Sequence, residues 1–363
     1  MTIDQLIEYA KEQQCSDIHI TSMGEIAIRQ FGTLMKLKGP YTMEYLDGLI
    51  YQMLDEEKTA IYDSGKDLDF SYETPGTNIR CRVNVFHQRG TNAAVLRIMG
   101  SVIPTIESLK LPPVIQSFAD QPRGLVLVTG PTGSGKSTTL AAMIDYINRN
   151  RAEHILTIED PIEYVYTPDK STIRQREIGQ DVDSFAGALR SALREDPDVI
   201  LVGEMRDFET ISAAITAAET GHLVMSTLHT TGAADTINRI IDVFPPHNQA
   251  QIRTQLASVL KGVITQNLIP LAEGQGRVAA TEILVCTDAI ANMIRSDKVY
   301  QIDSALQTGG KEGMHTLNMD LKDLVTKGVI TKEMAIKRSN NPKELAGVHE
   351  PMGGMNMNSM MMM

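Results

Sequence analysis

The spacing of hydrophobic and polar positions divides the chain into two regions with different periods. In the first hundred residues, short stretches alternate between apolar and polar side chains, which is typical of antiparallel strands. These stretches are 17–21, 25–30, 34–37, 67–72, 79–87 and 93–99. Helical spacing predicts helices over 1–14 and 43–62. The first region is therefore expected to be a small α+β domain that ends near residue 100.

The stretch that begins at Ile79 alternates most regularly. Cys81, Val83 and Val85 point to the same side as Ile79, while Arg82 points to the other. Two interpretations of that polar side remain open: a solvated face of a half-buried strand, or a functional face.

Proline-rich residues 101–122 predict a linker with a short helix. Beyond it, near-continuous apolar runs alternate with helical patterns, which indicates a parallel sheet buried on both faces. The runs are Leu125–Val128, Ile155–Ile158, Val199–Val202 and Leu223–Met225, with a further strand expected at Arg277–Val285. Helices dominate from about 288 to 338. This is an α/β arrangement of the RecA-like P-loop class, expected over 123–345 and followed by a disordered methionine-rich tail at 346–363.

Composition excludes several classes of function. A net charge of −11 and the absence of tryptophan disfavour nucleic acid as the main partner. The three cysteines are far apart, so neither a disulfide framework nor a zinc site is expected, and a reducing cytosol is the natural compartment. We expect no signal peptide and no membrane-spanning segment, so any membrane role comes through a partner.

The strongest chemical signal is the sequence GPTGSGKS, which starts at Gly130 between a predicted strand and a predicted helix. This spacing is the P-loop signature, in which backbone amides and a helix N-terminus hold nucleotide phosphates. Lys136 is expected on the β- and γ-phosphates and Ser137 on Mg²⁺. The expected ATP-binding set is Gly130, Pro131, Thr132, Gly133, Ser134, Gly135, Lys136, Ser137 and Thr138.

Three further polar clusters accompany the predicted parallel strands, at whose carboxyl ends such sheets bind ligands. They contain Glu159-Asp160 with Glu163, Glu204 with Arg206, and Ser226–His229, which ends the strand that follows His222. A carboxylate there can hold Mg²⁺ through water or orient the attacking water, and a histidine can contact the γ-phosphate. Together with the P-loop, these clusters predict a hydrolase.

The segments TIEDPIEYV, ALRSALREDPDVILVGEMRD and TAAETGHLVMSTLHT resemble the Asp box, Walker B region and His box of the secretion-ATPase superfamily. Over residues 1 to about 345 the chain is most similar to the branch that retracts type IV pili. The resemblance implies a PAS-like N-terminal domain, a RecA-like ATPase domain, a ring of six subunits, and ATP bound between the two domains.

The resemblance also implies roles for individual residues. Glu204 matches the glutamate that activates the lytic water and, with Ser137, binds Mg²⁺ partly through water. Glu159, Asp160 and Glu163 match the acidic box, which positions metal and water. His222 and His229 match the His-box histidines, with His229 reading the γ-phosphate.

Five arginines complete the predicted site. Arg190 and Arg194 are four residues apart, which places them on one helix face, and their motif implies charge stabilisation of the triphosphate, including from a neighbouring subunit. Arg206 follows the Walker B glutamate. By resemblance, Arg82 and Arg97 lie on N-domain strands that face nucleotide in related ATPases.

The expected function is a hexameric, cytoplasmic ATPase docked at the inner-membrane base of the pilus machine, where it powers pilus retraction through a platform protein. One alternative is an accessory retraction paralogue, which could also be a partner. A second is a pilus-extension or type II secretion ATPase, which usually carries a tetracysteine zinc insert, whereas this ATPase region contains Cys286 alone. From other classes, a nucleic-acid translocase and a non-catalytic nucleotide sensor remain, and Glu204 argues against the sensor.

Two features depart from the retraction pattern. The motif that reads roughly AIRNLIRE in that branch, where it is tied to retraction, is AIANMIRSDK here. Ala291 replaces a basic residue and Ser296-Asp297 replaces an acid. The methionine-rich tail also lies outside the family pattern.

Overall fold

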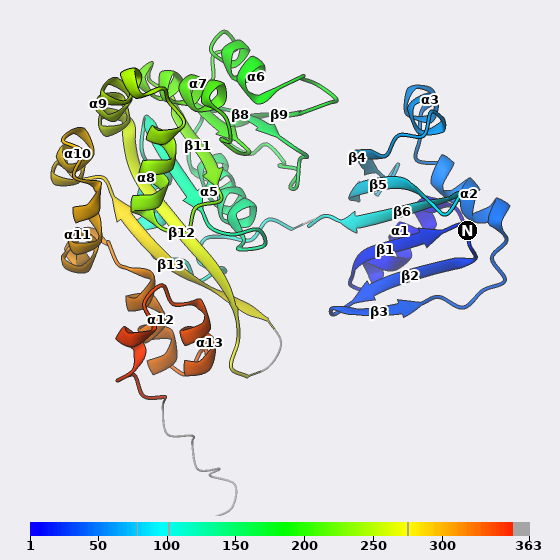
Figure 1. The fold of residues 1–363 in the computed structure, drawn as a ribbon. Helices are drawn as coiled ribbons and strands as arrows, with labels where there is room; N and C mark the ends of the chain where they lie inside the picture. Colours follow the sequence, from blue (N-terminus) through cyan, green and yellow to red (C-terminus); the bar gives the residue numbers. More distant parts are fainter. Residues whose placement is uncertain (78, 101, 274–275, 351–363) are drawn as a thin grey trace, which may run out of the picture. The chain divides into compact units, whose positions relative to one another are not determined.

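The computed structural model describes residues 1–77, 79–100, 102–273 and 276–350, which fall into two compact units (Figure 1). The first unit comprises Met1–Ile103 together with Asp160–Val165, and the second begins at Pro104. Most of the segment expected to be a linker therefore groups with the second unit. The methionine-rich end of the tail, residues 351–363, lies outside the described residues.

The first unit is an α+β fold. Its elements are α1 (Ile3–Glu12), β1 (Cys15–Thr21), β2 (Glu25–Gln30), β3 (Thr33–Lys36), α2 (Met43–Tyr51), α3 (Glu56–Asp63), β4 (Leu68–Glu73), β5 (Arg80–Gln88) and β6 (Thr91–Ile98). Within the described residues, the six strands form one antiparallel sheet in the order β3-β2-β1-β6-β5-β4. All six strands predicted from the sequence are therefore present.

The helix expected over 43–62 is two helices. The side chain of Asp55 accepts a hydrogen bond from the amide of Lys58 at 2.8 Å, which is the N-cap geometry that starts a new helix. Asp55 takes an extended backbone at that position, so α2 ends at Tyr51 and α3 begins at Glu56. The apolar spacing continued across this break and concealed it.

The core of the first unit lies between its helices and one face of its sheet. Helices α1 and α2 pack against β1 and β6. The alternation of β5 is as predicted, because Cys81, Val83 and Val85 are buried while Arg82 is exposed on the opposite face. That opposite face carries the arginines discussed below.

The second unit is an α/β fold, and its elements alternate as the sequence indicates. They are α4 (Val114–Ala119), β7 (Gly124–Thr129), α5 (Lys136–Asn150), β8 (His154–Glu159), β9 (Thr172–Glu177), α6 (Phe185–Ala192), β10 (Val199–Val202), α7 (Phe208–Glu219), β11 (Leu223–Leu228), α8 (Ala233–Asp242), α9 (Gln249–Val259), β12 (Leu260–Pro270), β13 (Arg277–Val285), α10 (Asp288–Arg295), α11 (Ile302–Thr308), α12 (Leu317–Thr326) and α13 (Lys332–Arg338).

Seven strands of the described chain form the sheet of this unit, in the order β13-β12-β7-β11-β10-β8-β9. All neighbours are parallel except β12 and β13, which are antiparallel. The sequence did not predict β9 or β12. Strand β12 lies beside β7 and therefore reaches the residues that precede the P-loop.

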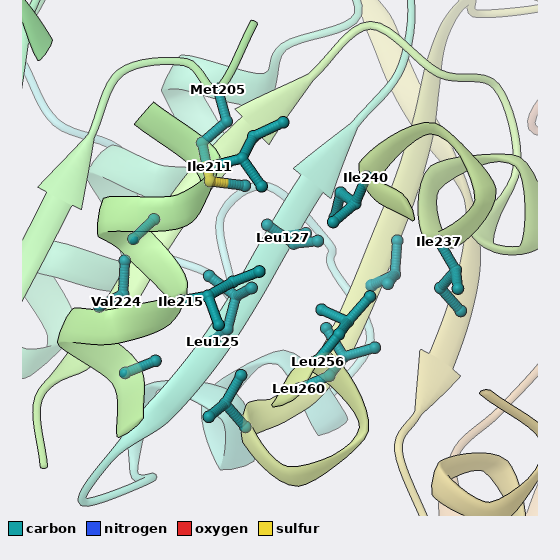
Figure 2. Packing of buried hydrophobic residues seen from close by; sticks show 14 of the residues in the cluster. Leu125, Leu127, Met205, Ile211, Ile215, Val224, Ile237, Ile240, Leu256 and Leu260 are labelled. Carbon is teal, nitrogen blue, oxygen red and sulfur yellow. The ribbon is translucent and has the colours of Figure 1, made fainter. Parts of the chain in front are cut away.

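The sheet is buried on both faces, as its near-continuous apolar strands predict. Leu125 and Leu127 of β7 belong to a core that contains side chains from α6 to α11. Val126 and Val128 alternate with them and point to the other face, where α5 packs against β7 and β11. Figure 2 labels members of the first core: Leu125, Leu127, Ile211, Ile215, Ile237, Ile240, Leu256 and Leu260.

The two units confirm the expected class, an α/β ATPase-type domain with a smaller α+β domain before it. In the described parts of the chain, the helices are too short or too polar to cross a membrane.

Candidate functional site

The predicted chemistry gathers at one edge of the seven-stranded sheet. Strands β7, β11, β10 and β8 are adjacent and parallel, so the residues that follow them emerge on the same side. The P-loop follows β7, His229 follows β11, Glu204 follows β10, and Glu159 ends β8. Strand order alone therefore brings together groups that are up to about a hundred residues apart in the sequence.

The loop itself is folded around its lysine. Nζ of Lys136 donates to the carbonyl oxygens of Gly130 at 2.9 Å and Pro131 at 3.2 Å. Gly135 caps α5 with a φ of 89°, a conformation that a side chain would strain. Lys136 and Ser137 thus occupy the first two positions of α5, at the end of the helix that attracts anions.

Three observations show that this loop fits a bound phosphate. Gly133 has a φ of 79°, and a Cβ built there has no described atom within 4 Å, so its backbone faces open space. The glycine that caps α5 has no side chain to hydrogen-bond the first helical amides. The buried hydroxyl of Ser134 is without a hydrogen-bond partner among the described residues.

The oxygen donors near the loop fit magnesium chemistry. Ser137 supplies a hydroxyl and Glu204 a carboxylate, the hard ligands that Mg²⁺ prefers. Among the described residues, no three acidic, histidine or cysteine side chains converge in a way that could hold a metal ion. Mg²⁺ usually keeps several waters and takes its remaining ligands from substrate phosphates.

The carboxylate of Glu204 lies close to one arginine and one histidine. Oε2 of Glu204 lies 2.6 Å from Nε of Arg206 and 3.7 Å from Nε2 of His229. The side chain of Glu204 is 18% exposed, whereas Arg206 is 70% exposed and His229 is 44% exposed. A carboxylate that is mostly shielded but open on one side can accept a proton from a water molecule bound next to it.

His229 has a pKa below its ordinary value. Burial is the largest cause, because it disfavours the charged imidazolium, and the positive charge of Lys136 adds to this effect. The carboxylate of Glu204 acts in the opposite direction without overcoming them. The imidazole is therefore neutral at pH 7 and can donate one hydrogen bond while accepting another.

Glu159 is held in place by its own strand and the next one. Its Oε1 accepts from the hydroxyl of Thr157 at 2.6 Å and from the amide of Gln175 at 3.3 Å. Gln175 lies on β9, a strand that the sequence did not predict. Asp160 and Glu163 group with the first unit, and their expected roles stay predictions.

His222 is not brought to this cluster within the chain. It precedes β11, whereas His229 follows it, and six strand residues separate their ends by about 20 Å. Its Nδ1 lies 2.9 Å from the carbonyl oxygen of Ala217 and 3.2 Å from the hydroxyl of Thr220. The strand predicted between the two histidines therefore puts them at opposite edges of the sheet, and the role expected for His222 stays a prediction.

The predicted arginine pair also differs from expectation. Helix α6 ends at Ala192, so Arg190 is helical while Arg194 lies in the following turn, with its amide bonded to the Ser191 carbonyl. The two side chains do not share a helix face. Both are exposed, and their expected role at the triphosphate stays a prediction.

Arg82 and Arg97 lie directly opposite each other on β5 and β6 of the first unit. Arg82 binds Asp69 with Nη2 at 2.5 Å, and the pKa of its guanidinium is raised chiefly by this hydrogen bond. Nε of Arg97 lies 3.1 Å from Asp17, which is buried although Arg97 is exposed. Each arginine therefore has an acidic partner in its own unit.

One residue beside the loop was missed entirely. Gln266 lies on β12, is buried, and hydrogen-bonds both Ser134 and Thr139. The available signal was the pair Thr265-Gln266 within the apolar run GVITQNLI, since buried polar residues require partners.

Known proteins resemble the chain over nearly its whole length. The family described as type II/IV secretion system protein matches residues 1–337. The type IV pilus retractation ATPase PilT of Pseudomonas aeruginosa is 50% identical over 344 residues, which cover 94% of this chain and 99% of that protein. A twitching motility protein of Neisseria gonorrhoeae is 50% identical over 320 residues, or 88% of this chain and 85% of its own length.

A solved structure agrees with these relatives. The crystal structure of the pilus retraction motor PilT with bound ADP superposes with a TM-score of 0.89 at 47% identity, covering 95% of this chain and 98% of the other. The fold and the P-loop sequence thus occur in a chain that matches one family over residues 1–337. This protein belongs to the family of type II/IV secretion system proteins, as its motifs predict.

Proposed function

We propose that this protein is an ATP-hydrolysing motor that powers the retraction of type IV pili. The observation that carries the proposal is the gathering of Lys136, Glu204 and His229 at one edge of the sheet, in a chain half identical to a retraction ATPase. Nucleotide use is further supported by the similar PilT structure, which contains ADP.

The residues at this edge of the sheet have different roles in hydrolysis. The P-loop amides and Lys136 bind and orient the phosphates. Glu204 accepts the proton of the attacking water, since its carboxylate is oriented by Arg206 and only partly exposed. Neutral His229, next to Glu204, donates a hydrogen bond to the γ-phosphoryl group that is transferred to water, with ADP as the leaving group. Ser137 and, through water, Glu204 would hold Mg²⁺, which would neutralise charge on the phosphates.

The work performed by the motor requires further partners. We propose that six copies form a ring, that the ring acts in the cytoplasm at the inner-membrane base of the pilus, and that a platform protein there transmits the motion. The roles expected for Arg82, Arg97, Arg190 and Arg194 belong to this proposal, because a ring allows arginines to act on a nucleotide of another subunit.

Two alternatives use the same chemistry with a different outcome. An extension or type II secretion ATPase would drive pilus or pseudopilus assembly, and an accessory paralogue would assist a principal retraction motor. The 50% identity to PilT over 94% of this chain favours retraction.

Deletion of the gene in the native host distinguishes these outcomes. A retraction motor predicts an excess of surface pili together with loss of surface motility. Complementation with the wild-type gene should restore both properties, whereas Lys136→Ala should restore neither. Absence of pili would instead indicate an extension motor, and normal motility with normal pilus number would contradict a principal retraction role.

A further inference from the structure

Gln266 lies directly beside the start of the phosphate-binding loop. Strand β12 pairs with β7 so that Thr265 is opposite Thr129, and Gln266 is therefore next to Gly130, where β7 ends. Its side chain is enclosed, with the residue only 1% exposed. We infer that Gln266 is a positioning residue of the nucleotide site, which fixes the phosphate-binding loop from a different strand and so sets its affinity for nucleotide phosphates.

Two hydrogen bonds define what the amide does. Nε2 of Gln266 donates to the carbonyl oxygen of Ser134 at 2.7 Å, and its Oε1 accepts from the hydroxyl of Thr139 at 2.9 Å. A carbonyl oxygen can only accept, so Ser134 determines which end of the amide carries the nitrogen. The oxygen then faces Thr139, whose hydroxyl must donate.

These two bonds bracket the residues that hold the phosphate. Ser134 lies in the loop before Lys136, and Thr139 lies in the first turn of α5 after Ser137. A single side chain from β12 therefore connects the loop to the helix on both sides of Lys136 and Ser137. Loss of the amide would let loop and helix move relative to each other where a displacement of about 1 Å matters for the bound group.

The loop glycines show the same close approach. A Cβ at Gly130 would overlap the carbonyl oxygen of Gln266, and one at Gly135 would lie 3.1 Å from its Nε2. By contrast, Gly133 faces open space. The Gly130 contact is with the main chain of Gln266 and the Gly135 contact is with its side chain, so the absence of a Cβ at both positions lets β12 approach the loop closely.

The inference rests on the proposed function and makes it more specific. If Gln266 holds the loop in the conformation that binds phosphate, loss of its side chain weakens the binding of the ground state and of the transition state equally. Uniform loss of binding raises KM and leaves kcat nearly unchanged. A role confined to packing would instead lower thermal stability and leave the nucleotide dissociation constant unchanged.

The test uses the full chain and compares Gln266→Met with Thr265→Val. Methionine keeps the length of the side chain but removes both hydrogen bonds. Thr265→Val removes the 2.8 Å bond between the Thr265 and Thr129 hydroxyls, which joins the same two strands without touching Ser134 or Thr139. Fluorescent ADP and Mg·ATP are titrated, and KM and kcat are measured for each variant.

We expect Gln266→Met to raise the dissociation constants of ADP and ATP, and KM, by about tenfold, with kcat within about threefold of wild type. Thr265→Val should bind nucleotide as wild type does. Thr139→Val, which leaves Gln266 in place, should weaken binding by a smaller factor and add little to Gln266→Met, because both act through one amide. That variant keeps the test valid if Gln266→Met does not fold.

Unchanged nucleotide binding in both Gln266→Met and Thr139→Val would overturn the inference, as would an equal loss in Thr265→Val. Failure of the proposed function would give a different result, because the wild-type protein itself would then not bind ADP or hydrolyse ATP.

Discussion

Arg206 lies with its Nε 2.6 Å from Oε2 of Glu204, although the two residues are separated only by Met205 and the arginine is mostly exposed. The ion pair restrains the orientation of the Glu204 carboxylate. An exposed ion pair of this kind contributes little to stability, about 0–1 kcal/mol. The ion pair matters instead because it orients the carboxylate that acts as the base.

Glu204→Gln should keep nucleotide binding and lose turnover. The amide has the size of the carboxylate but cannot accept a proton from water, and loss of a general base typically lowers rates by about 10²–10⁴-fold. Phosphate release measures turnover, and ADP titration measures binding. Glu209→Gln, an exposed acid in the first turn of α7, is the matched control and should behave as wild type. Full activity in Glu204→Gln would remove this residue from the catalytic role.

The pKa of His229 predicts a pH dependence of the nucleotide-free protein. Because the folded pKa lies below 6.5, the unfolded chain binds more protons in the window between the two values. Stability should therefore rise with pH through a window that lies below pH 6.5 and be unaffected by this group above it. His229→Gln removes the titrating group, so its thermal midpoint should depend less on pH between 5 and 6.5. Parallel curves for the two proteins would contradict the prediction.

Glu282 caps a helix from a neighbouring strand. Helix α8 follows Gly232, which has no side chain, and Oε1 of Glu282 on β13 accepts from the Ala233 amide at 2.8 Å instead. Burial raises the pKa of this carboxyl, so the ionised form is disfavoured in the fold. The associated stability is present below pH 4.5 and is lost as pH rises through the folded pKa.

Substitution of Glu282 separates the hydrogen bond from the charge. Glu282→Gln keeps an acceptor without the buried charge, and its thermal midpoint at pH 7 should equal or exceed that of wild type. Glu282→Leu leaves buried amides without an acceptor, which costs about 1–3 kcal/mol. Thermal unfolding at pH 5 and pH 8 measures both effects. A Gln variant as unstable as the Leu variant would show that the charge, and not the acceptor, is what the fold requires.

The end of the divergent motif AIANMIRSDK, just after α10, carries an ion pair. Asp297 has a φ of 58° and accepts from Arg253 of α9 at Nε and Nη2, at 3.0 and 2.9 Å. Asp297→Gly retains the backbone conformation and removes the carboxylate, so the change in unfolding free energy should be small, about 0–1 kcal/mol. A double-mutant cycle with Arg253→Gln isolates the pair. A coupling energy of zero would assign the conformation of this turn to the backbone alone.

Local signals in the sequence were sufficient to locate the loop, because the P-loop spacing specifies a turn between a strand and a helix wherever it occurs. The positions of Glu204 and His229 could also be predicted, because each residue follows an apolar strand that lies in the same sheet as the strand before the loop. Strand β12 was missed since Thr265 and Gln266 interrupt its apolar run, and both are paired only through the fold.

Helical periodicity assigned Arg190 and Arg194 to one helix face, but the helix ends between them at Ala192, a boundary that the sequence did not predict. His222 and His229 belong to one motif, and the strand predicted between them separates them in space, because a strand rises about 3.3 Å per residue. The role expected for His222 stays a prediction.

The bonds of Lys136 to its own loop have a consequence for how nucleotide enters. Because the carbonyl oxygens of Gly130 and Pro131 accept hydrogen bonds from the ammonium group of Lys136, these oxygens compete with phosphate for the same cation. When a phosphate binds, the ammonium group of Lys136 exchanges these carbonyl oxygens for phosphate oxygens. The net free energy of binding is the difference between these two hydrogen-bonded states. A nucleotide phosphate therefore competes with two carbonyl oxygens of the loop for the ammonium group of Lys136.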